Sequence, residues 1–397
     1  MSNVPARTAL VLGGGGLKGF AHIGVIRALE ERGIRPSVIA GTSIGALIGA
    51  AYAGGMSVSE MEARAVSLRR RDLFRLNHVG MLFERMHTPS LYLEEPLRDL
   101  CASTSPAGTF DDLSIPVLVN TVDVERGTRL VWGLPGLRDV PVVDAVYASC
   151  ALPGFFPPGY VGTRSCIDGG TIDNLPISIA ALGADAVIAV DVGSFEVERP
   201  RDINSQGFAA IYMRAATLMM HALQQRPLAD WSGPPMLLVR PNVGRHHWFS
   251  FTHGADMVNA GYDAARTALD LAGDALCTGT GVYPRSMVSV HVDRARCIGC
   301  GTCVALAPRV MALDAEGKAT VNATPLQWSP TDGDFVQHCP TEAITVQTLD
   351  GTRRTTRPMS DPTLDTGETH AAQAPSGVNN RPGSRTRAVP PASPPRG

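Results

Sequence analysis

The chain has 397 residues, of which 44% are hydrophobic and 18% charged, and its formal net charge is −2. The hydrophobic content suffices for a buried core, and the length allows two or three domains. The charge is nearly balanced and no basic stripe with interleaved aromatic residues occurs, so we expect no nucleic-acid partner. No apolar run approaches the ~18 residues that span a bilayer, and residues 1–7 lack a signal-peptide pattern. We therefore expect a cytoplasmic protein whose contact with membranes is at most peripheral.

The first predicted unit is a strand, a glycine loop and a helix. Residues 8–12 are an apolar strand, residues 13–19 read GGGGLKG, and residues 20–32 have helical spacing. Such a loop presents backbone N–H groups at the positive end of a helix, which predicts an anion or oxyanion site. The loop also fits the G-x-G-x-x-G dinucleotide pattern. We favour the oxyanion interpretation, because the next strand ends at residues 39–40 without the expected acidic residue.

The second unit is the G-x-S-x-G sequence at residues 41–45. It lies between the end of a buried strand and an Ala/Gly/Leu run that opens a helix. A strand, a sharp turn and a helix in this order predict a nucleophile elbow, in which the turn lifts the hydroxyl of Ser43 out of the sheet. A plain tight turn is the alternative. His22, one turn past the glycine loop, is interpreted as a packed structural histidine and not as part of a triad.

The middle of the chain offers fewer chemical signals. Residues 57–112 predict helical patches from which no chemistry can be read. A strand at residues 115–123 with a hairpin return at residues 130–132 is expected next, followed by a short helix at residues 142–149. The proline-rich residues 151–158 predict an irregular loop, whose Phe and Leu side chains either wall an acyl pocket or pack on the sheet.

Asp168 is the candidate acid. It follows a strand that ends at residues 166–167 and precedes two glycines, so its carboxylate is free of side-chain crowding. It could take a proton from a serine hydroxyl or orient a base that does so. Asp123 and Asp191 also end strands and compete for this role.

Four further elements complete the first part of the chain. Residues 184–192 and 236–240 predict strands, and residues 254–272 predict a closing helix. Residues 206–225 carry an apolar stripe at helical spacing, made of Phe208, Ile211, Tyr212, Ala215, Met219 and Leu223. We expect this stripe to pack on the core, with a lid or a surface that rests on lipid as the alternative.

Four ordered motifs carry a family resemblance. They are residues 13–19, residues 41–45, the sequence ASCALPG at residues 148–154, and DGG at residues 168–170 with NLP at residues 174–176. Together they resemble the patatin-like phospholipases, particularly the bacterial branch, from about residue 6 to about residue 275. The resemblance implies an α/β fold with three α/β/α layers. It also implies a Ser–Asp dyad that hydrolyses acyl esters of lipids, with no metal at the hydrolase site.

The resemblance also assigns roles to individual residues. Ser43 is similar to the family's nucleophile, and Asp168 to the base that activates it. Gly15 and Gly16 would supply the N–H groups of the oxyanion hole, with Gly14 adjoining them. Lys18 would help to support the loop. The reaction implied is acyl transfer to the serine, followed by attack of water on the acyl-enzyme.

The eight cysteines form two groups. Four are scattered, and we interpret them as small buried residues of a reduced protein: Cys101, Cys150, Cys166 and Cys277. The other four stand in a C-x2-C-x2-C run with a distant Cys-Pro: Cys297, Cys300, Cys303 and Cys339. This is ligand spacing for an iron–sulfur cluster, with structural zinc as the alternative.

Residues 286–348 resemble the small bacterial-type ferredoxins. Ala307 precedes Pro308 where the two-cluster pattern has a fourth cysteine, and Cys300 is present where three-iron relatives lack it. The resemblance therefore implies a small α+β, ferredoxin-like domain with one 4Fe-4S cluster.

The expected domains are an acyl hydrolase at residues 1–278, an iron–sulfur domain at residues 286–348 and a disordered, Pro/Ser/Thr/Gly/Arg-rich tail at residues 349–397. We expect a lipid acyl hydrolase, a phospholipase or esterase, acting on phospholipid or another acyl ester. Its iron–sulfur module would transfer electrons or sense redox state. The alternatives are an acyltransferase, or an electron-transfer protein whose patatin-like part recognises lipid or an acylated partner. A redox partner protein and a peripheral membrane surface are the further partners considered.

Overall fold

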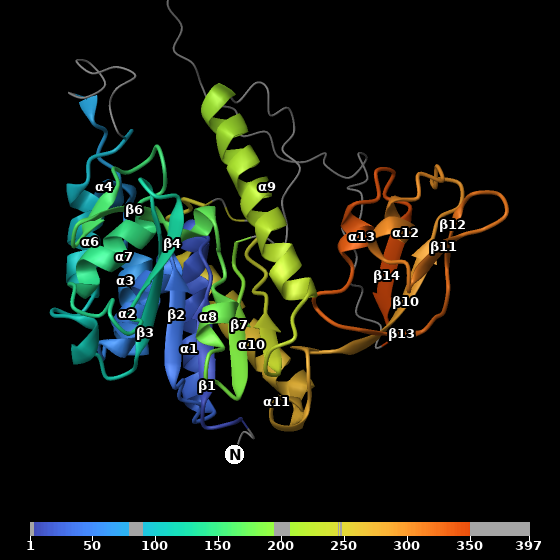
Figure 1. The fold of residues 1–397 in the computed structure, drawn as a ribbon, viewed down its shortest axis with the longest axis horizontal. Coiled ribbons are helices and arrows are strands. Elements are labelled where there is room, and N and C mark those ends of the chain that lie inside the picture. The colour runs from blue at the N-terminus through green and yellow to red at the C-terminus, as the bar shows by residue number, and fades with distance from the viewer. Residues whose placement is uncertain (1–3, 79–89, 194–206, 245, 247, 350–397) are drawn as a thin grey trace, which may run out of the picture. The chain divides into compact units, whose positions relative to one another are not determined.

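The computed structural model describes residues 4–78, 90–193, 207–244, 246 and 248–349. Its elements alternate between strands and helices over most of the chain (Figure 1). In chain order they are β1 (Thr8–Leu12), the 3-10 helix η1 (Gly16–Phe20), α1 (Ala21–Glu31), β2 (Val38–Thr42), α2 (Ile44–Ala53), α3 (Val58–Ser67), α4 (Arg70–Leu73), α6 (Glu95–Thr104), η3 (Phe110–Asp112), β3 (Val117–Asp123), β4 (Thr128–Trp132), α7 (Val142–Cys150), β5 (Gly159–Val161), β6 (Arg164–Asp168), η4 (Gly169–Thr171), α8 (Ile177–Ala180), β7 (Ala186–Val190), α9 (Gly207–Ala229), β8 (Met236–Val239), α10 (Gly254–Ala272), α11 (Ala275–Thr278), β9 (Val282–Tyr283), β10 (Ser286–Val292), α12 (Thr302–Leu306), β11 (Met311–Leu313), β12 (Ala319–Val321), β13 (Leu326–Trp328), α13 (Asp334–Gln337) and β14 (Ile344–Thr348).

The main sheet has nine strands in the order β5-β6-β3-β2-β1-β7-β8-β9, with β4 also paired to β3. Strands β3, β2, β1, β7, β8 and β9 are parallel to their neighbours in this series, whereas β4, β5 and β6 pair antiparallel. The chain leaves β1 toward β2 on one side and later returns to β7 on the other. Such a switch point is where open α/β sheets bind ligands, at the carboxyl ends of the strands.

Both faces of this sheet are covered. Alternate side chains of β1 point to opposite faces, so Leu10 and Leu12 join one apolar cluster and Ala9 and Val11 join another. The first cluster contains the buried faces of α1, α2, α3, α6, α7 and α10, and the second those of α8 and the end of α9. The predicted three-layer α/β/α fold is therefore confirmed.

The strand register brings the motifs of the first part together. Thr42 at the end of β2 pairs with Asn120 on β3, and Thr121 beside it pairs with Asp168 at the end of β6. Residues more than a hundred positions apart in the sequence thus meet at one edge of the sheet, directly before the turn that contains Ser43.

The C-terminal part of the described chain forms small sheets of its own. Strands β13, β10 and β14 pair antiparallel, and β11 pairs with β12. A separate apolar cluster underlies them and includes Val288, Trp328 and Phe335. The hydrolase is expected to end at residue 278, but β9 adds one more strand to the main sheet at Val282–Tyr283. The tail expected from residue 349 lies outside the described residues, apart from Leu349.

Helix α9 differs from its prediction. Four residues of the predicted stripe, Ile211, Tyr212, Met219 and Leu223, do share one face but are 44–59% exposed. The side chain of Phe208 lies outside the described part of the structure. The helix packs inward with the opposite face, where Leu228 is buried. The expectation that the stripe packs on the core is therefore wrong, because helical spacing shows which residues share a face but not which face meets the core. Among the described residues, no helix is both long and apolar enough to span a membrane.

Helices α1 and α10 approach each other so closely that glycine is needed at the contact. A Cβ atom on Gly24 would lie 1.8 Å from the Val258 carbonyl oxygen, and one on Gly261 would lie 1.9 Å from that of Ala21. A side chain at either position must push the helices apart.

We expect Gly24→Val to lower the free energy of unfolding by about 2 kcal/mol or more, because overpacking a close contact forces backbone shifts. Urea denaturation measures this. Ala255→Val, on an exposed position of α10, is the matched control and should cost less than about 1 kcal/mol. Equal stability of Gly24→Val and the wild type would show that the helices do not pack as described.

Candidate active site

The turn after β2 has the geometry predicted for a nucleophile elbow. Ser43 has φ 57° and ψ −127°, one of two non-glycine residues with positive φ among those described. Such a conformation costs of order 1–3 kcal/mol and persists only where the surroundings impose it. A Cβ on Gly45 would lie 2.1 Å from the Leu12 carbonyl oxygen, so glycine allows α2 to begin directly against β1.

Ser149 holds this turn in place, a contribution that the sequence analysis missed. Its hydroxyl accepts the Ser43 N–H at 2.8 Å and donates to the Asn120 carbonyl oxygen at 2.7 Å. The side chain is fully buried at the end of α7. Its place in the ASCALPG motif was the available signal, but nothing local indicated which of that motif's residues faces the elbow.

Asp168 ends β6 beside the elbow, as predicted. Its carboxylate accepts the Gly170 N–H at 2.8 Å and a hydrogen bond from the Ser43 hydroxyl. The side chain is 4% exposed, and this burial raises the pKa of Asp168 to about 6, although both hydrogen bonds oppose the shift. The group is thus a carboxylate at neutral pH that binds a proton more readily than an exposed aspartate.

The two competing acids are already engaged by arginines. Asp123 is fully buried and pairs with Arg126 at 3.1 Å and with Arg164 at 3.2 Å. Asp191 pairs with Arg240 at 3.3 Å. These ion pairs favour structural roles for both, and the structure brings neither of them to the Ser43 hydroxyl through a hydrogen bond among the described residues.

The glycine loop after β1 lies next to the elbow. Gly13 N–H donates to the Val190 carbonyl oxygen at 3.0 Å, and Gly14 N–H to that of Asn174 at 3.2 Å. Gly15 and Gly16 make no such backbone bond through their N–H groups within the described residues. The N–H of Gly14, the glycine expected to adjoin the oxyanion hole, is therefore already used in a backbone hydrogen bond, whereas, in the described part of the chain, those of Gly15 and Gly16, its expected donors, are not.

Two side chains accompany this loop. Lys18 is 7% exposed within η1, which suits the supporting role expected for it. His22 is fully buried, and its Nε2 lies 2.8 Å from the Gly13 carbonyl oxygen. Burial lowers the pKa of His22 to about 4, so the ring is neutral and donates to that carbonyl. His22 therefore fastens the loop, in agreement with the structural role predicted for it.

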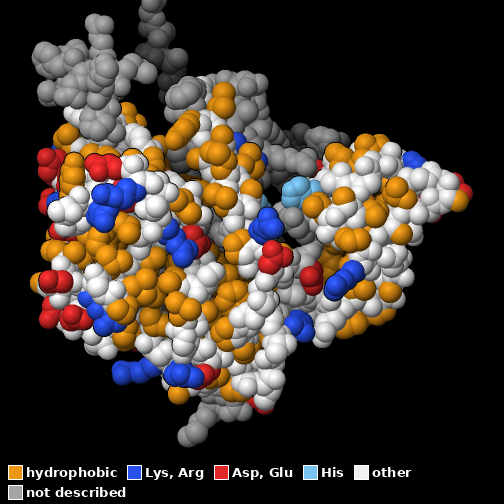
Figure 2. All heavy atoms as spheres, viewed as in Figure 1, with side chains coloured by type: hydrophobic (Ala, Val, Ile, Leu, Met, Phe, Trp, Pro, Cys, Tyr) orange, Lys and Arg blue, Asp and Glu red, His pale blue; other side chains and the backbone are white. Residues whose placement is uncertain are grey.

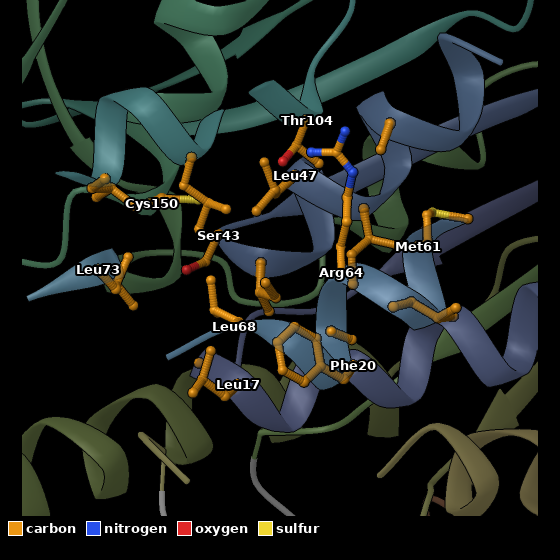
Figure 3. A pocket seen from close by; sticks show the side chains of 18 of the residues that line it. Leu17, Phe20, Ser43, Leu47, Met61, Arg64, Leu68, Leu73, Thr104 and Cys150 are labelled. Carbon is orange, nitrogen blue, oxygen red and sulfur yellow. The ribbon is translucent and has the colours of Figure 1, made fainter. Parts of the chain in front are cut away.

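An apolar cavity of about 940 Å³, including its open mouth, begins at Ser43. Gly16, Ser43 and Asp168 all line it. From there it follows α2, and Figure 3 shows its side chains from close by. The lining residues are Gly16, Leu17, Phe20, Ile23, Ser43, Ile44, Leu47, Ile48, Ala51, Met56, Met61, Arg64, Ala65, Leu68, Leu73, Leu97, Leu100, Thr104, Cys150, Leu152, Phe156, Asp168, Trp248 and Phe249.

The far part of the cavity comes from a region in which sequence reasoning found no chemistry. Helices α3 and α6, within residues 57–112, supply Met61, Arg64, Leu97 and Thr104 among others. Arg64 extends toward Thr104 (Figure 3) and pairs with Glu60 at 3.1 Å. The Thr104 hydroxyl has no hydrogen-bond partner among the described residues. The cavity is thus apolar along its length and polar at this end.

The loop at residues 151–158 serves both of its predicted alternatives. Leu152 and Phe156 line the cavity. Phe156 also stacks on Phe74 with ring centroids 5.8 Å apart, so the loop packs within the apolar cluster.

The scattered cysteines are free thiols, but one departs from its prediction. Cys101 and Cys166 are buried and Cys150 is half-buried, whereas Cys277 is exposed, so the expectation of burial is wrong there. Cys150 lines the cavity near Ser43. A hydrogen bond with the Cys101 thiol and burial raise the pKa of Cys150 well above its usual range, so it stays a neutral thiol.

The four C-terminal cysteines line one small cavity. Cys297 and Cys303 are buried, Cys339 is half-buried and Cys300 is exposed. Backbone N–H groups donate to two of the sulfurs, from Ala319 to Cys297 at 3.4 Å and from Ala343 to Cys339 at 3.3 Å. In the part of the chain that the structure describes, no three His, Cys, Asp or Glu side chains are grouped around a single metal-ion position.

Comparison with known proteins bears on both parts of the chain. Residues 10–181 match the family model of the patatin-like phospholipases, and residues 290–346 match that of the 4Fe-4S single cluster domain. The chain is 36% identical over 197 residues to an uncharacterized NTE family protein of Mycobacterium tuberculosis, covering 49% of this chain and 52% of that protein. It is 35% identical over 199 residues to lysophospholipase nte1 of Emericella nidulans, covering 48% of this chain and 12% of that protein.

The chain therefore spans about half the length of the mycobacterial relative and a much smaller part of the fungal one. Among solved structures, VipD from Legionella pneumophila matches with 17% identity and a TM-score of 0.35, covering 67% of each chain.

The raised pKa of Asp168 gives a prediction for the chemistry of Ser43. The rate at which Ser43 is acylated by a short-chain p-nitrophenyl ester should rise with pH through about 6, because Asp168 can accept a proton only when ionised. Stopped-flow measurements over a range of pH locate this rise in rate. If His22, with a pKa of about 4, accepted the proton, the rate would rise at lower pH. A rise near pH 4, or one that is unchanged in Asp168→Asn, would show that another group accepts the proton.

Proposed function

Because this chain carries a patatin-like phospholipase domain at residues 10–181 and a 4Fe-4S single cluster domain at residues 290–346, we propose that it is a lipid acyl hydrolase with an appended iron–sulfur module. The observation that carries the proposal is that Ser43, Asp168 and Gly16 line one apolar cavity. A hydroxyl, a carboxylate and one of the loop glycines thus border a common space in which an ester could lie.

The proposed reaction proceeds through an acyl-enzyme. Ser43 Oγ attacks the ester carbonyl carbon while its proton passes to the Asp168 carboxylate. The negative charge that develops on the carbonyl oxygen is stabilised by the N–H groups of Gly15 and Gly16. The C–O bond to the alcohol then breaks, and the alcohol leaves with the proton held by Asp168. Water attacks the acyl-serine in the same way, and the products are a fatty acid and free Ser43.

The cavity favours a lipid acyl chain as the group transferred to the serine. Its lining is apolar from Ser43 past Leu47 to Ala51, a helical distance of about 12 Å. Burying an alkyl chain along that length removes apolar surface from water, which is favourable at about 25 cal/mol per Å². Phospholipids and other acyl esters present such chains, and we propose them as the substrate class.

The domain assignment remains part of this proposal. We assign residues 1–278 to the hydrolase, together with β9 of its sheet, and residues 286–348 to the iron–sulfur domain. We propose a cytoplasmic location, where thiols such as these eight cysteines stay reduced. Electron transfer to a redox partner, or sensing of redox state, is the role that an iron–sulfur module would add.

The four C-terminal cysteines fit a 4Fe-4S cluster. Such a cluster takes one thiolate at each iron, so it needs ligands arranged around a cavity and not about one point. Cys297, Cys300, Cys303 and Cys339 line such a cavity. The N–H donors to the sulfurs of Cys297 and Cys339 would stabilise their thiolates.

The hydrolase proposal predicts that fatty acid is released from mixed phospholipid vesicles and from a short-chain ester. Ser43→Ala should abolish this release, and Asp168→Asn should lower the rate by on the order of a hundredfold or more. Mass spectrometry of the free fatty acids, at matched protein and iron content, measures both. Cys277→Ala, an exposed position away from the cavity, is the control and should leave the rate unchanged. Undiminished release by Ser43→Ala would refute the proposal.

The cluster proposal predicts about four irons per chain after anaerobic purification. Cys339→Ala should lose most of this iron and the visible charge-transfer absorbance, because one iron loses its ligand. Cys277→Ala should keep both. Zinc in place of iron in the wild type, with no visible absorbance, would establish a structural zinc site instead.

A further inference from the structure

Helix α9 has two faces of opposite environment. Its inner face is buried at Gln224 and Leu228, whereas five large apolar side chains on the outer face are 44–59% exposed. These five, which we call the outer face of α9, are Ile211, Tyr212, Leu218, Met219 and Leu223. At 100° per residue they fall within an arc of about 140°. Figure 2 shows hydrophobic side chains along this helix.

The charges of α9 are all of one sign. Residues Gly207–Ala229 contain Arg214 and Arg226 and no aspartate or glutamate. Arg226 makes an exposed ion pair at 3.5 Å with Asp230, just beyond the helix, and such pairs are weak. An apolar helix face accompanied by arginines fits the boundary between the headgroups and acyl chains of an anionic lipid surface. Because α9 carries no acidic residue, its charge complements an anionic surface and not a basic protein partner.

The inner face of α9 contacts the loops of the candidate active site. Gln224 accepts a hydrogen bond from Asn174 at 3.3 Å, and Asn174 donates to the Gly14 carbonyl oxygen at 3.1 Å. The methyl group of Met220 lies against Gly170, because a Cβ atom added to this glycine would be 2.9 Å from it. Gly170 in turn donates its N–H to the Asp168 carboxylate. The same helix therefore combines an exposed apolar face with direct contact to Gly170 and Asn174, and Asn174 links it to the glycine loop.

From these observations we infer that the outer face of α9 is the surface through which this protein binds an anionic lipid bilayer. The inference rests on the proposed function, because an acyl hydrolase must meet a substrate that is held in a lipid aggregate. Docking through α9 would bring the helix that contacts Gly170 and Asn174 against that aggregate. The helix lies on the lipid with its outer face inserted and its inner face still packed on the sheet.

Vesicle sedimentation tests this surface without requiring turnover. The wild type should bind phosphatidylcholine vesicles that contain one part in about three of phosphatidylglycerol, and bind them less at high salt. The double variant Met219→Asp with Leu223→Asp should lower the partition coefficient by on the order of tenfold or more, because it places two charges in the apolar layer. Its hydrolysis of a soluble short-chain ester should remain within about twofold of the wild type.

The matched control is Leu182→Asp with Leu271→Asp, which changes the net charge equally at leucines that are 70% and 56% exposed elsewhere. This control should bind vesicles as the wild type does. The inference is overturned if the α9 variant binds undiminished, if the control loses as much binding, or if the wild type binds pure phosphatidylcholine equally well. A wild-type dimer in solution that the α9 variant abolishes would assign the face to a second copy of the chain and also overturn it.

Ser43→Ala separates this result from the proposed function. It should bind vesicles like the wild type although it releases no fatty acid. Hydrolysis that persists in Ser43→Ala would refute the proposed nucleophile and leave the sedimentation result standing. Lost vesicle binding in the α9 variant, with intact ester hydrolysis, supports the surface alone.

Discussion

The sharp turn between β2 and α2 is the constraint on which the site depends. It holds Ser43 at φ 57°, a backbone conformation that costs about 1–3 kcal/mol in a non-glycine residue. The surroundings impose the conformation from two sides. Gly45 lets α2 start against the Leu12 carbonyl, and Ser149 ties the Ser43 N–H to β3. Because the Ser43 N–H donates to Ser149, this N–H is not itself available as a donor to a substrate oxygen.

Burial links the cavity to the chemistry of the base. The apolar side chains that could accept an acyl chain also exclude water from Asp168, and this raises its pKa to about 6. An aspartate paired with arginine, such as Asp123, is held in its ionised form and is less able to accept a proton. Among the described residues, Asp168 has no arginine partner of this kind. Burial raises its pKa, and the hydrogen bonds from Gly170 and Ser43 lower it by less. The pKa of Asp168 therefore lies closer to neutrality than that of an exposed aspartate.

Local rules account for what the sequence could predict. The strand, glycine loop and helix around residues 8–32, and the turn at Ser43, follow from short apolar runs and from glycines at fixed positions. The strand before Asp168 and the two glycines after it made this residue a candidate, but Asp123 and Asp191 also end strands, and only the family resemblance singled Asp168 out. The spacing of the four C-terminal cysteines likewise predicts a shared site without any knowledge of the fold.

Features that arise from packing between distant segments could not be predicted. The far wall of the cavity uses Met61 and Leu97 from helices whose sequence shows only amphipathic spacing. The bond from Ser149 to the elbow joins residues 106 positions apart. The two-residue strand β9 is too short to give a periodic signal. For α9, periodicity identified the apolar stripe correctly but could not show that the opposite face meets the sheet.

Covalent labelling of the serine tests the central claim most directly. A fluorophosphonate with a long alkyl chain reacts with a serine hydroxyl that has an adjacent base and an apolar acyl cavity, and peptide mass spectrometry locates the adduct. The account predicts an adduct on Ser43 in the wild type, formed at least about a hundredfold more slowly in Asp168→Asn. The account would be contradicted if the folded wild type acquired no adduct at Ser43. It would also be contradicted if the Asp168→Asn variant were labelled as fast as the wild type.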